Sequence, residues 1–153
     1  GGGGRRDNDG VLRYFRLFLL LPGTGLLVLD TVKRPHASLF EQRFFTPVRA
    51  TPQANGFRLQ GERQTATITC ACSEEATLHT AAAPLTQPSG APPTMLRQIT
   101  KLLHEEILMA TLLTPGARAA PLALRRASRE GVDVAIGAGG RRVLRLGRDL
   151  LPR

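Results

Sequence analysis

The chain has 153 residues, which suits one domain, since typical domains run to roughly 100–200 residues. With 42% hydrophobic and 22% charged residues, its composition is globular and excludes disorder throughout the chain. The formal net charge is +9, and all but Lys33 and Lys101 of the 21 basic residues are arginines. Because the guanidinium fork matches carboxylate, sulfate and phosphate, an acidic partner is one reading and solvated surface charge is the other.

The composition argues against two classes of partner. The sequence contains no Trp and one Tyr and has no Lys/Arg-rich tract, so we expect no nucleic-acid partner. Its longest apolar run, residues 17–29, is interrupted by Pro22, Gly23 and Gly25, and is shorter than the roughly 20 residues that span a membrane. We therefore expect no membrane partner. The chain starts with four glycines and no Met, which we interpret as a fragment boundary.

The first predicted elements form a hairpin. Residues 1–10 are polar and glycine-rich, a composition typical of a flexible tail. The apolar runs 11–21 and 25–33 flank "PGTG", and a Pro-Gly turn between two such runs predicts antiparallel strands. We place one antiparallel β-sandwich domain at 11–148 and a second tail at 149–153.

The next segment, residues 37–48, alternates apolar with polar side chains. Phe40 and Phe44 fall on one face and Glu41 and Arg43 on the other, a pattern typical of a half-buried strand. Pro-rich residues 84–94 predict a loop. Short strands spaced by turn signals favour an antiparallel sandwich or barrel, and we predict the later ones at 56–62, 65–72, 76–83, 106–116, 121–128, 131–140 and 141–148.

One stretch leaves two alternatives open. Residues 95–113, "MLRQITKLLHEEILMATLL", consist mostly of good helix formers and taken alone favour a helix. The surrounding strand pattern favours strands instead, because a sheet needs neighbours on both sides. The predicted fold class is therefore mainly β, an antiparallel sandwich, with room for one short helix near 95–105.

The chemistry-bearing residues do not form a recognisable catalytic or metal-binding motif. Cys70 and Cys72 would share one face of a strand, and a single Cys-x-Cys pair predicts buried free thiols rather than a zinc site. His36, His79 and His104 are far apart in the sequence, and each is expected in a turn or on the surface. The residues themselves therefore predict no catalytic set and no metal or other cofactor in this chain.

The segment from Val11 to Pro47 resembles the C-terminal β-sheet region of the heparinase II/III-like polysaccharide lyases. In that family a strand that begins with Arg is followed by a turn and by a second strand that ends in Asp. After a short loop come His-x-x-x-x-x-Gln, a pair of aromatic residues and Pro. The strand "ATLLTPG", residues 110–116, resembles a later strand end of the same domain. One position departs from the family, which commonly has His where this chain has the second aromatic. The positions matched here are Arg13, Asp30, His36, Gln42, Phe44, Phe45 and Pro47.

The resemblance implies a part of a lyase that cleaves uronate-containing acidic polysaccharide, such as a glycosaminoglycan or alginate, by β-elimination. It implies a bacterial periplasmic or secreted location and an N-terminal helical toroid domain as the partner within the parent chain. In the family the catalytic Tyr and Asn lie in the toroid. The catalytic His, and zinc where it occurs, lie in sheet segments upstream of the matched stretch. We therefore expect this fragment to carry none of them and to be inactive alone.

Two polar residues within the resemblance are expected to have structural roles. Asp30 closes a predicted strand, where its carboxylate can accept backbone N–H groups of the following turn or pair with an arginine such as Arg34. Gln42 is placed in the same structural class, and a ligand-facing role for Asp30 remains the other reading. The alternative to a lyase fragment is a non-catalytic β-sandwich that binds carbohydrate or another partner.

Overall fold

The computed structural model describes residues 13–83, 92–128, 131–137 and 142–147, and the secondary structure found there consists of strands. The two tails predicted at 1–10 and 149–153 lie outside this described part. The described residues contain no candidate membrane-spanning helix. The strands are β1 (Arg13–Leu21), β2 (Gly25–Ser38), β3 (Glu41–Thr46), β4 (Arg49–Gln53), β5 (Gly56–Gln60), β6 (Thr65–Cys72), β7 (Ala76–Ala82), β8 (Thr94–Thr100), β9 (His104–Pro115), β10 (Leu122–Ser128), β11 (Gly131–Ile136) and β12 (Arg142–Gly147).

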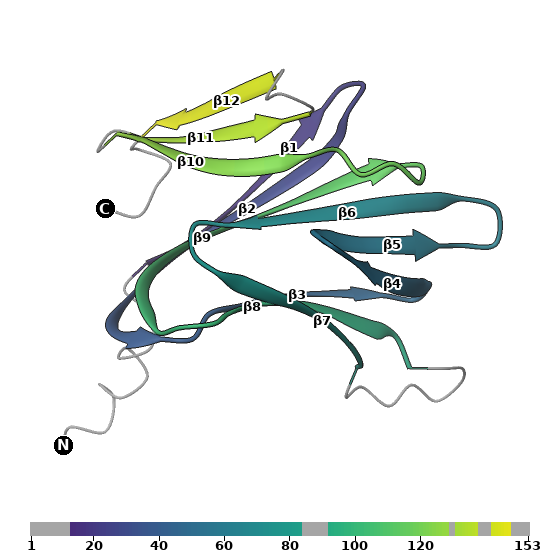
Figure 1. Cartoon of the computed structure of the whole chain (residues 1–153), viewed down its shortest axis with the longest axis horizontal. Helices are drawn as coiled ribbons and strands as arrows, with labels where there is room; N and C mark the ends of the chain where they lie inside the picture. The colour runs from purple at the N-terminus through teal and green to yellow at the C-terminus, as the bar shows by residue number, and fades with distance from the viewer. Residues whose placement is uncertain (1–12, 84–91, 129–130, 138–141, 148–153) are drawn as a thin grey trace.

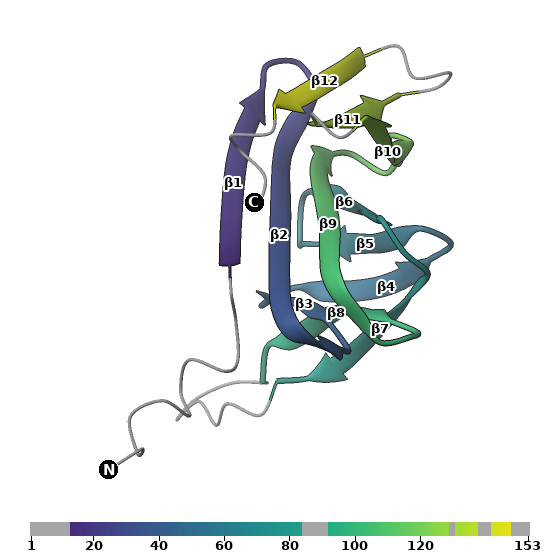
Figure 2. The ribbon, with the colours of Figure 1, turned by 90° about the vertical axis from the view of Figure 1, so that its left-hand side faces the viewer.

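The strands build three antiparallel sheets. The largest has six strands in the order β1-β2-β9-β6-β5-β4, and two smaller sheets have the orders β10-β11-β12 and β3-β8-β7. Figures 1 and 2 show the two smaller sheets on opposite sides of the large one. The mainly β, antiparallel sandwich predicted from the strand spacing is confirmed.

Alternation of side chains along β2 and β9 supplies a core on each face of the large sheet. Leu27, Leu29 and Leu112 are fully buried in one cluster, which includes Val132 and Val134 of β11. The side chains one residue along point the other way, toward the sheet β3-β8-β7. There Ile107 and Met109 of β9 form a second cluster with Phe40. A third cluster is built by other strands, around Phe57 of β5, Ile68 of β6 and Leu96 of β8.

The predicted β1–β2 hairpin is confirmed, with antiparallel pairing from Arg13 opposite Lys33 to Leu21 opposite Gly25. The strand predicted at 37–48 is present in part, as β3 over Glu41–Thr46, while residues 37–38 belong to β2. However, β3 pairs with β8 rather than with β2 and so belongs to a different sheet. The chain leaves the large sheet at the end of β2, after an irregularity in the β2–β9 register between Lys33 and Ser38, and then enters β3.

The helix allowed near 95–105 is wrong, because β8 and β9 occupy most of the segment. In β8, Leu96, Gln98 and Thr100 are buried at alternate positions, which is the periodicity of a strand. Pairing with β3 and β7 outweighs the helical preference of these residues, since propensity is weaker than tertiary context. Strand β4 was missed, because "TPQANG" reads as a turn.

Candidate functional site

A buried cluster of polar side chains surrounds Asp30. The residue lies in β2, is 4% exposed, and faces Arg16 directly across the β1–β2 pair. Arg16 Nε donates to Oδ1 at 2.5 Å and Nη2 donates to Oδ2 at 2.7 Å, which is the two-pronged geometry of a strong Arg–carboxylate pair. The cation is therefore Arg16, not the Arg34 that sequence proximity suggested.

Gln42 extends the cluster from the large sheet to the sheet β3-β8-β7. Its Nε2 donates to Asp30 Oδ2 at 2.6 Å, and its Oε1 accepts from the Thr111 hydroxyl of β9 at 2.7 Å. Both ends of a buried amide are thus hydrogen-bonded, as a polar group inside a core must be if it is not to destabilise the fold. The geometry is that of a cross-link between the sheets, and the structural roles expected for Asp30 and Gln42 stay a prediction.

Tyr14, the only phenol in the chain, lies at the edge of this cluster. Its hydroxyl donates to Asp30 Oδ1 at 3.4 Å. Partial burial and the neighbouring Asp30 carboxylate raise the pKa of Tyr14 above its usual value. A raised pKa keeps the phenol protonated at neutral pH, which is unfavourable for a general base. The phenol of Tyr14 is therefore not an activated proton acceptor in this cluster.

The structure does not gather the histidines and cysteines into a metal site. His36 and His79 are exposed and His104 is partly exposed. Within the described residues, no group of three or more His, Cys, Asp or Glu side chains could hold a metal ion. The part of the chain that the structure describes therefore does not fit zinc.

Cys70 and Cys72 lie in β6 as free thiols. Burial raises the pKa of Cys70 to about 12, and burial likewise raises that of Cys72. Because the thiolate is the reactive form of cysteine, both side chains are poorly suited to nucleophilic chemistry at neutral pH.

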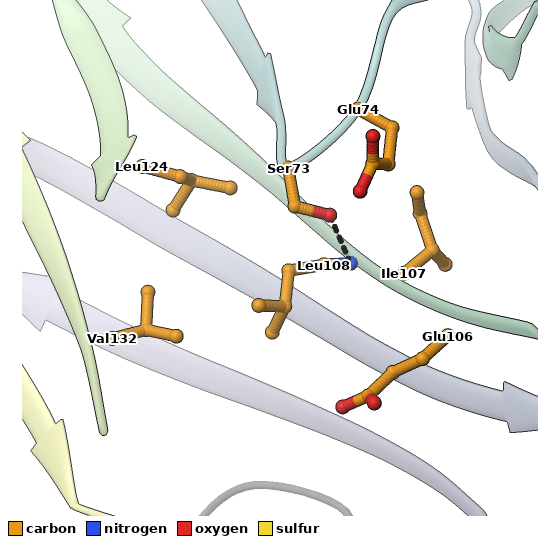
Figure 3. A pocket seen from close by; sticks show the side chains of 7 residues that line it. All are labelled: Ser73, Glu74, Glu106, Ile107, Leu108, Leu124 and Val132. Carbon is orange, nitrogen blue, oxygen red and sulfur yellow. Dashed lines mark hydrogen bonds between the residues drawn. The ribbon is translucent and has the colours of Figure 1, made fainter. Parts of the chain in front are cut away.

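A small cavity of about 150 Å³ opens between β9, β10, β11 and the turn that follows β6 (Figure 3). Glu74 and Glu106 contribute carboxylates to its lining, and the Ser73 hydroxyl accepts a hydrogen bond from the Leu108 amide at 3.1 Å. Leu124 and the other lining residues are apolar. This lining supplies acids but no arginine or lysine, so it does not favour an acidic ligand.

Four of the described arginines, Arg16, Arg43, Arg97 and Arg145, are paired with acids. Glu41 in β3 accepts from Arg43 at 2.7 Å and also pairs with Arg97 of β8. Arg43 and then Arg97 lower the pKa of Glu41 from 4.5 to about 2. A similar cross-strand pair joins Arg145 to Asp133 at 2.8 Å. These guanidinium groups are already engaged and are poorly placed to hold a ligand.

Two arginines of the β4–β5 hairpin differ from this pattern. Arg49 and Arg58 are exposed and line a shallow depression of about 280 Å³ together with polar neighbours. This surface is not predicted from the sequence, because "TPQANG" has the composition of a turn and hides strand β4. The available signal was charge: residues 42–61 contain no Asp or Glu, although Arg43, Arg49 and Arg58 lie within them.

No protein-family model and no curated protein matches the sequence. Among solved structures, the chain is similar to heparan sulfate lyase HepC from Pedobacter heparinus, with a TM-score of 0.65 and 9% identity over 92% of this chain. A mutant of the same lyase gives a TM-score of 0.61 and 10% identity, also over 92% of this chain. The match covers 24% of each lyase chain, so this chain spans about a quarter of their length. At such identities the likeness shows the fold alone.

Proposed function

We propose that this chain is the distal C-terminal β-sandwich portion of a heparinase II/III-like polysaccharide lyase. The observation that carries the proposal is the fold match to heparan sulfate lyase HepC over 92% of the chain. The sequence motif that includes Asp30 and Gln42 and ends at Pro47 supports the proposal independently, because it resembles the family without reference to the structure. The parent would cleave a uronate-containing acidic polysaccharide, a glycosaminoglycan or alginate, in the periplasm or outside the cell.

The chemistry of elimination indicates what this portion contributes. A base must remove the proton at C5, an acid must serve the leaving oxygen, and the uronate carboxylate must be neutralised. The described residues provide arginines for neutralisation but no credible base and acid pair. The upstream parts of the parent would supply those groups: the helical toroid would carry the Tyr and Asn, and the upstream sheet segments would carry the His and any zinc. This portion would support the fold through Asp30 and Gln42 and would contribute positive charge to the substrate cleft.

The test is a binding comparison on the purified chain. Heparan sulfate, alginate and uncharged dextran of similar length are titrated by calorimetry at low and moderate salt. We expect the two acidic polysaccharides to bind, with an affinity that falls as salt screens the charges, and dextran to show no binding. Failure of the chain to bind either acidic polysaccharide would contradict the proposed role in the substrate cleft.

A second candidate function is a carbohydrate-binding or interaction module without any lyase parent. It is favoured by Tyr14 and Phe18, which are 56% and 60% exposed and lie four residues apart in β1, hence on one face of an edge strand. Exposed aromatic rings can stack on sugar rings. If Tyr14→Ala/Phe18→Ala removes polysaccharide binding and dextran binds as well as heparan sulfate does, this second function is the better one.

A further inference from the structure

The outer face of the β4–β5 hairpin is a continuous polar surface. Arg49 lies opposite Gln60 and Thr51 lies opposite Arg58 in the antiparallel register, and all four side chains are exposed. Gln53, also exposed, continues the row beside the turn. We call these five residues, Arg49, Thr51, Gln53, Arg58 and Gln60, the arginine face. All five line the same shallow depression.

The opposite side of the hairpin fixes this face in place. Phe57 is 2% exposed and lies in a cluster with Ile68 and Leu96, and Ala50 and Leu59 pack against that cluster. Successive residues of a strand point to opposite faces, so the arginine face must point away from this core. Strand β5 is also paired along its length with β6. The backbone that carries the two arginines is therefore held on one face by the core and on one edge by the sheet.

The charge of the arginine face is not neutralised by any acid among the described residues. Neither Arg49 nor Arg58 forms an ion pair with any described residue, whereas Arg16, Arg97 and Arg145 each do. Arg49 and Arg58 lie on neighbouring strands at diagonal positions, within reach of long side chains, where like charges repel. An anion held between the two guanidinium groups would relieve that repulsion.

We infer that the arginine face is a binding site for an anionic saccharide, a surface on which sulfate or carboxylate groups of a polysaccharide chain are held by Arg49 and Arg58. Each guanidinium can bind such a group through two parallel hydrogen bonds. The Thr51 hydroxyl and the amides of Gln53 and Gln60 can exchange hydrogen bonds with sugar hydroxyls. An open, shallow depression suits a chain that lies across the sheet. The inference rests on the proposed function and assigns its acidic substrate to particular residues.

The test compares two double variants that remove the same formal charge. Arg49→Gln/Arg58→Gln neutralises the arginine face, and Arg125→Gln/Arg145→Gln neutralises two exposed arginines of the sheet β10-β11-β12, close to Asp133. Heparan sulfate affinity is measured for both and for the unaltered chain, with melting curves as a check on folding. We expect a loss of roughly tenfold or more for the first variant, and much less for the second, because charge-assisted hydrogen bonds to the saccharide are lost only in the first.

The outcomes separate this inference from the proposed function. If the unaltered chain binds heparan sulfate and the Arg49→Gln/Arg58→Gln variant binds it equally well, the arginine face is not the site, although the proposed function stands. An equal loss in both variants would also overturn the inference, since it indicates non-specific attraction. No binding by the unaltered chain contradicts the proposed function and the inference together.

Two further measurements define the ligand chemistry. Arg49→Lys/Arg58→Lys keeps the charge but removes the planar fork, so affinity should fall between those of the unaltered chain and the glutamine variant. Alginate carries carboxylates without sulfates. Selective binding of heparan sulfate therefore assigns sulfate as the group recognised, and equal binding of both assigns carboxylate. Equal binding of uncharged dextran would overturn the inference.

Discussion

Asp30 is a buried carboxylate whose hydrogen bonds all come from side chains far away in the sequence. Arg16, Gln42 and Tyr14 supply them from β1 and β3. Their distances along the chain, 12 to 16 residues, explain why the sequence showed that the acid was unusual without revealing its partners. Asp30 pairs with Arg16 and not with Arg34, the nearest arginine along β2, because Arg16 is the residue directly opposite in the register of the two strands.

Replacement of Asp30 tests this account. We expect Asp30→Ala to lower the free energy of unfolding by about 3 kcal/mol, because breaking a buried pair leaves the partners without their acceptor and Arg16 is only partly exposed. The matched control is Asp133→Ala, which also removes an acid paired with an arginine on the adjacent strand, but Arg145 is 73% exposed there. Denaturant titration should show a clearly smaller loss for the control. Equal losses would contradict the structural role of Asp30.

Glu41 makes stability depend on pH. Arg43 and Arg97 lower the pKa of Glu41 to about 2 in the folded chain, below its ordinary value of 4.5. A lowered folded-state pKa stabilises the fold above the ordinary value, and this stabilisation disappears as the pH falls from about 4.5 toward about 2. The stability difference between the unaltered chain and Glu41→Gln should therefore narrow over that window. Because these side chains are partly exposed, we expect a difference of about 1 kcal/mol or less at pH 7.

The measurement is the midpoint of urea unfolding at a series of pH values between 2 and 7. Glu75→Gln serves as a control, because Glu75 is 79% exposed and pairs only loosely with Lys101, at 3.7 Å. It should leave the unfolding free energy at pH 7 nearly unchanged. A Glu41→Gln difference that grows as the pH falls would have the wrong sign for this ion-pair cluster.

At the scale of single elements, the β1–β2 hairpin was predictable because its signals are local. The two apolar runs and the Pro-Gly turn lie within adjacent residues, and the turn closes with the Thr24 amide donating to the Leu21 carbonyl at 3.0 Å. The helix allowed near 95–105 is wrong and strand β4 was missed for the opposite reason, because their signals are not local. Helix formers there became strands because β3 and β7 pair with β8, and a Pro-containing turn signal became β4 because β5 pairs with it. Those partners are not visible in a local window.

The same hairpin supports a prediction about its glycines. Gly23 and Gly25 both have positive φ, 73° and 155°, but a Cβ at Gly23 would meet open space, while one at Gly25 would lie 2.0 Å from the Leu113 carbonyl oxygen of β9. We expect Gly23→Ala to cost about 1–2 kcal/mol of stability from backbone strain alone. Gly25→Ala should cost more, because two backbones must separate, and melting temperatures of both variants would show the order. The reverse order would contradict the close approach of β2 and β9.

At the scale of the whole molecule, the large sheet is covered on both faces, and each face has a different character. The face toward β11 and β12 carries the largest of the three apolar clusters. The face toward β3 and β8 combines apolar clusters with the hydrogen-bonded cluster of Asp30, Gln42 and Thr111. The strand spacing was sufficient to predict a sandwich. The division into three sheets was not predictable. It depends on β3 pairing with β8 instead of β2, and on β9 lying between β2 and β6 in the large sheet.

The arrangement of the whole molecule also predicts that the isolated chain does not cleave polysaccharide. Elimination needs a base and an acid within hydrogen-bond reach of one sugar. In the described residues, the raised pKa of Tyr14 disfavours it as a base, and no cluster gathers His36, His79 and His104. Incubation with heparan sulfate, heparin, chondroitin and alginate, with and without zinc, should therefore produce no ultraviolet absorbance from unsaturated uronate. The arginine face can still bind these chains, so binding without turnover is the expected result. Turnover that is lost in Tyr14→Phe or His36→Ala would place an active site within this sandwich. It would contradict the proposal that the catalytic residues lie in the upstream part of the parent chain.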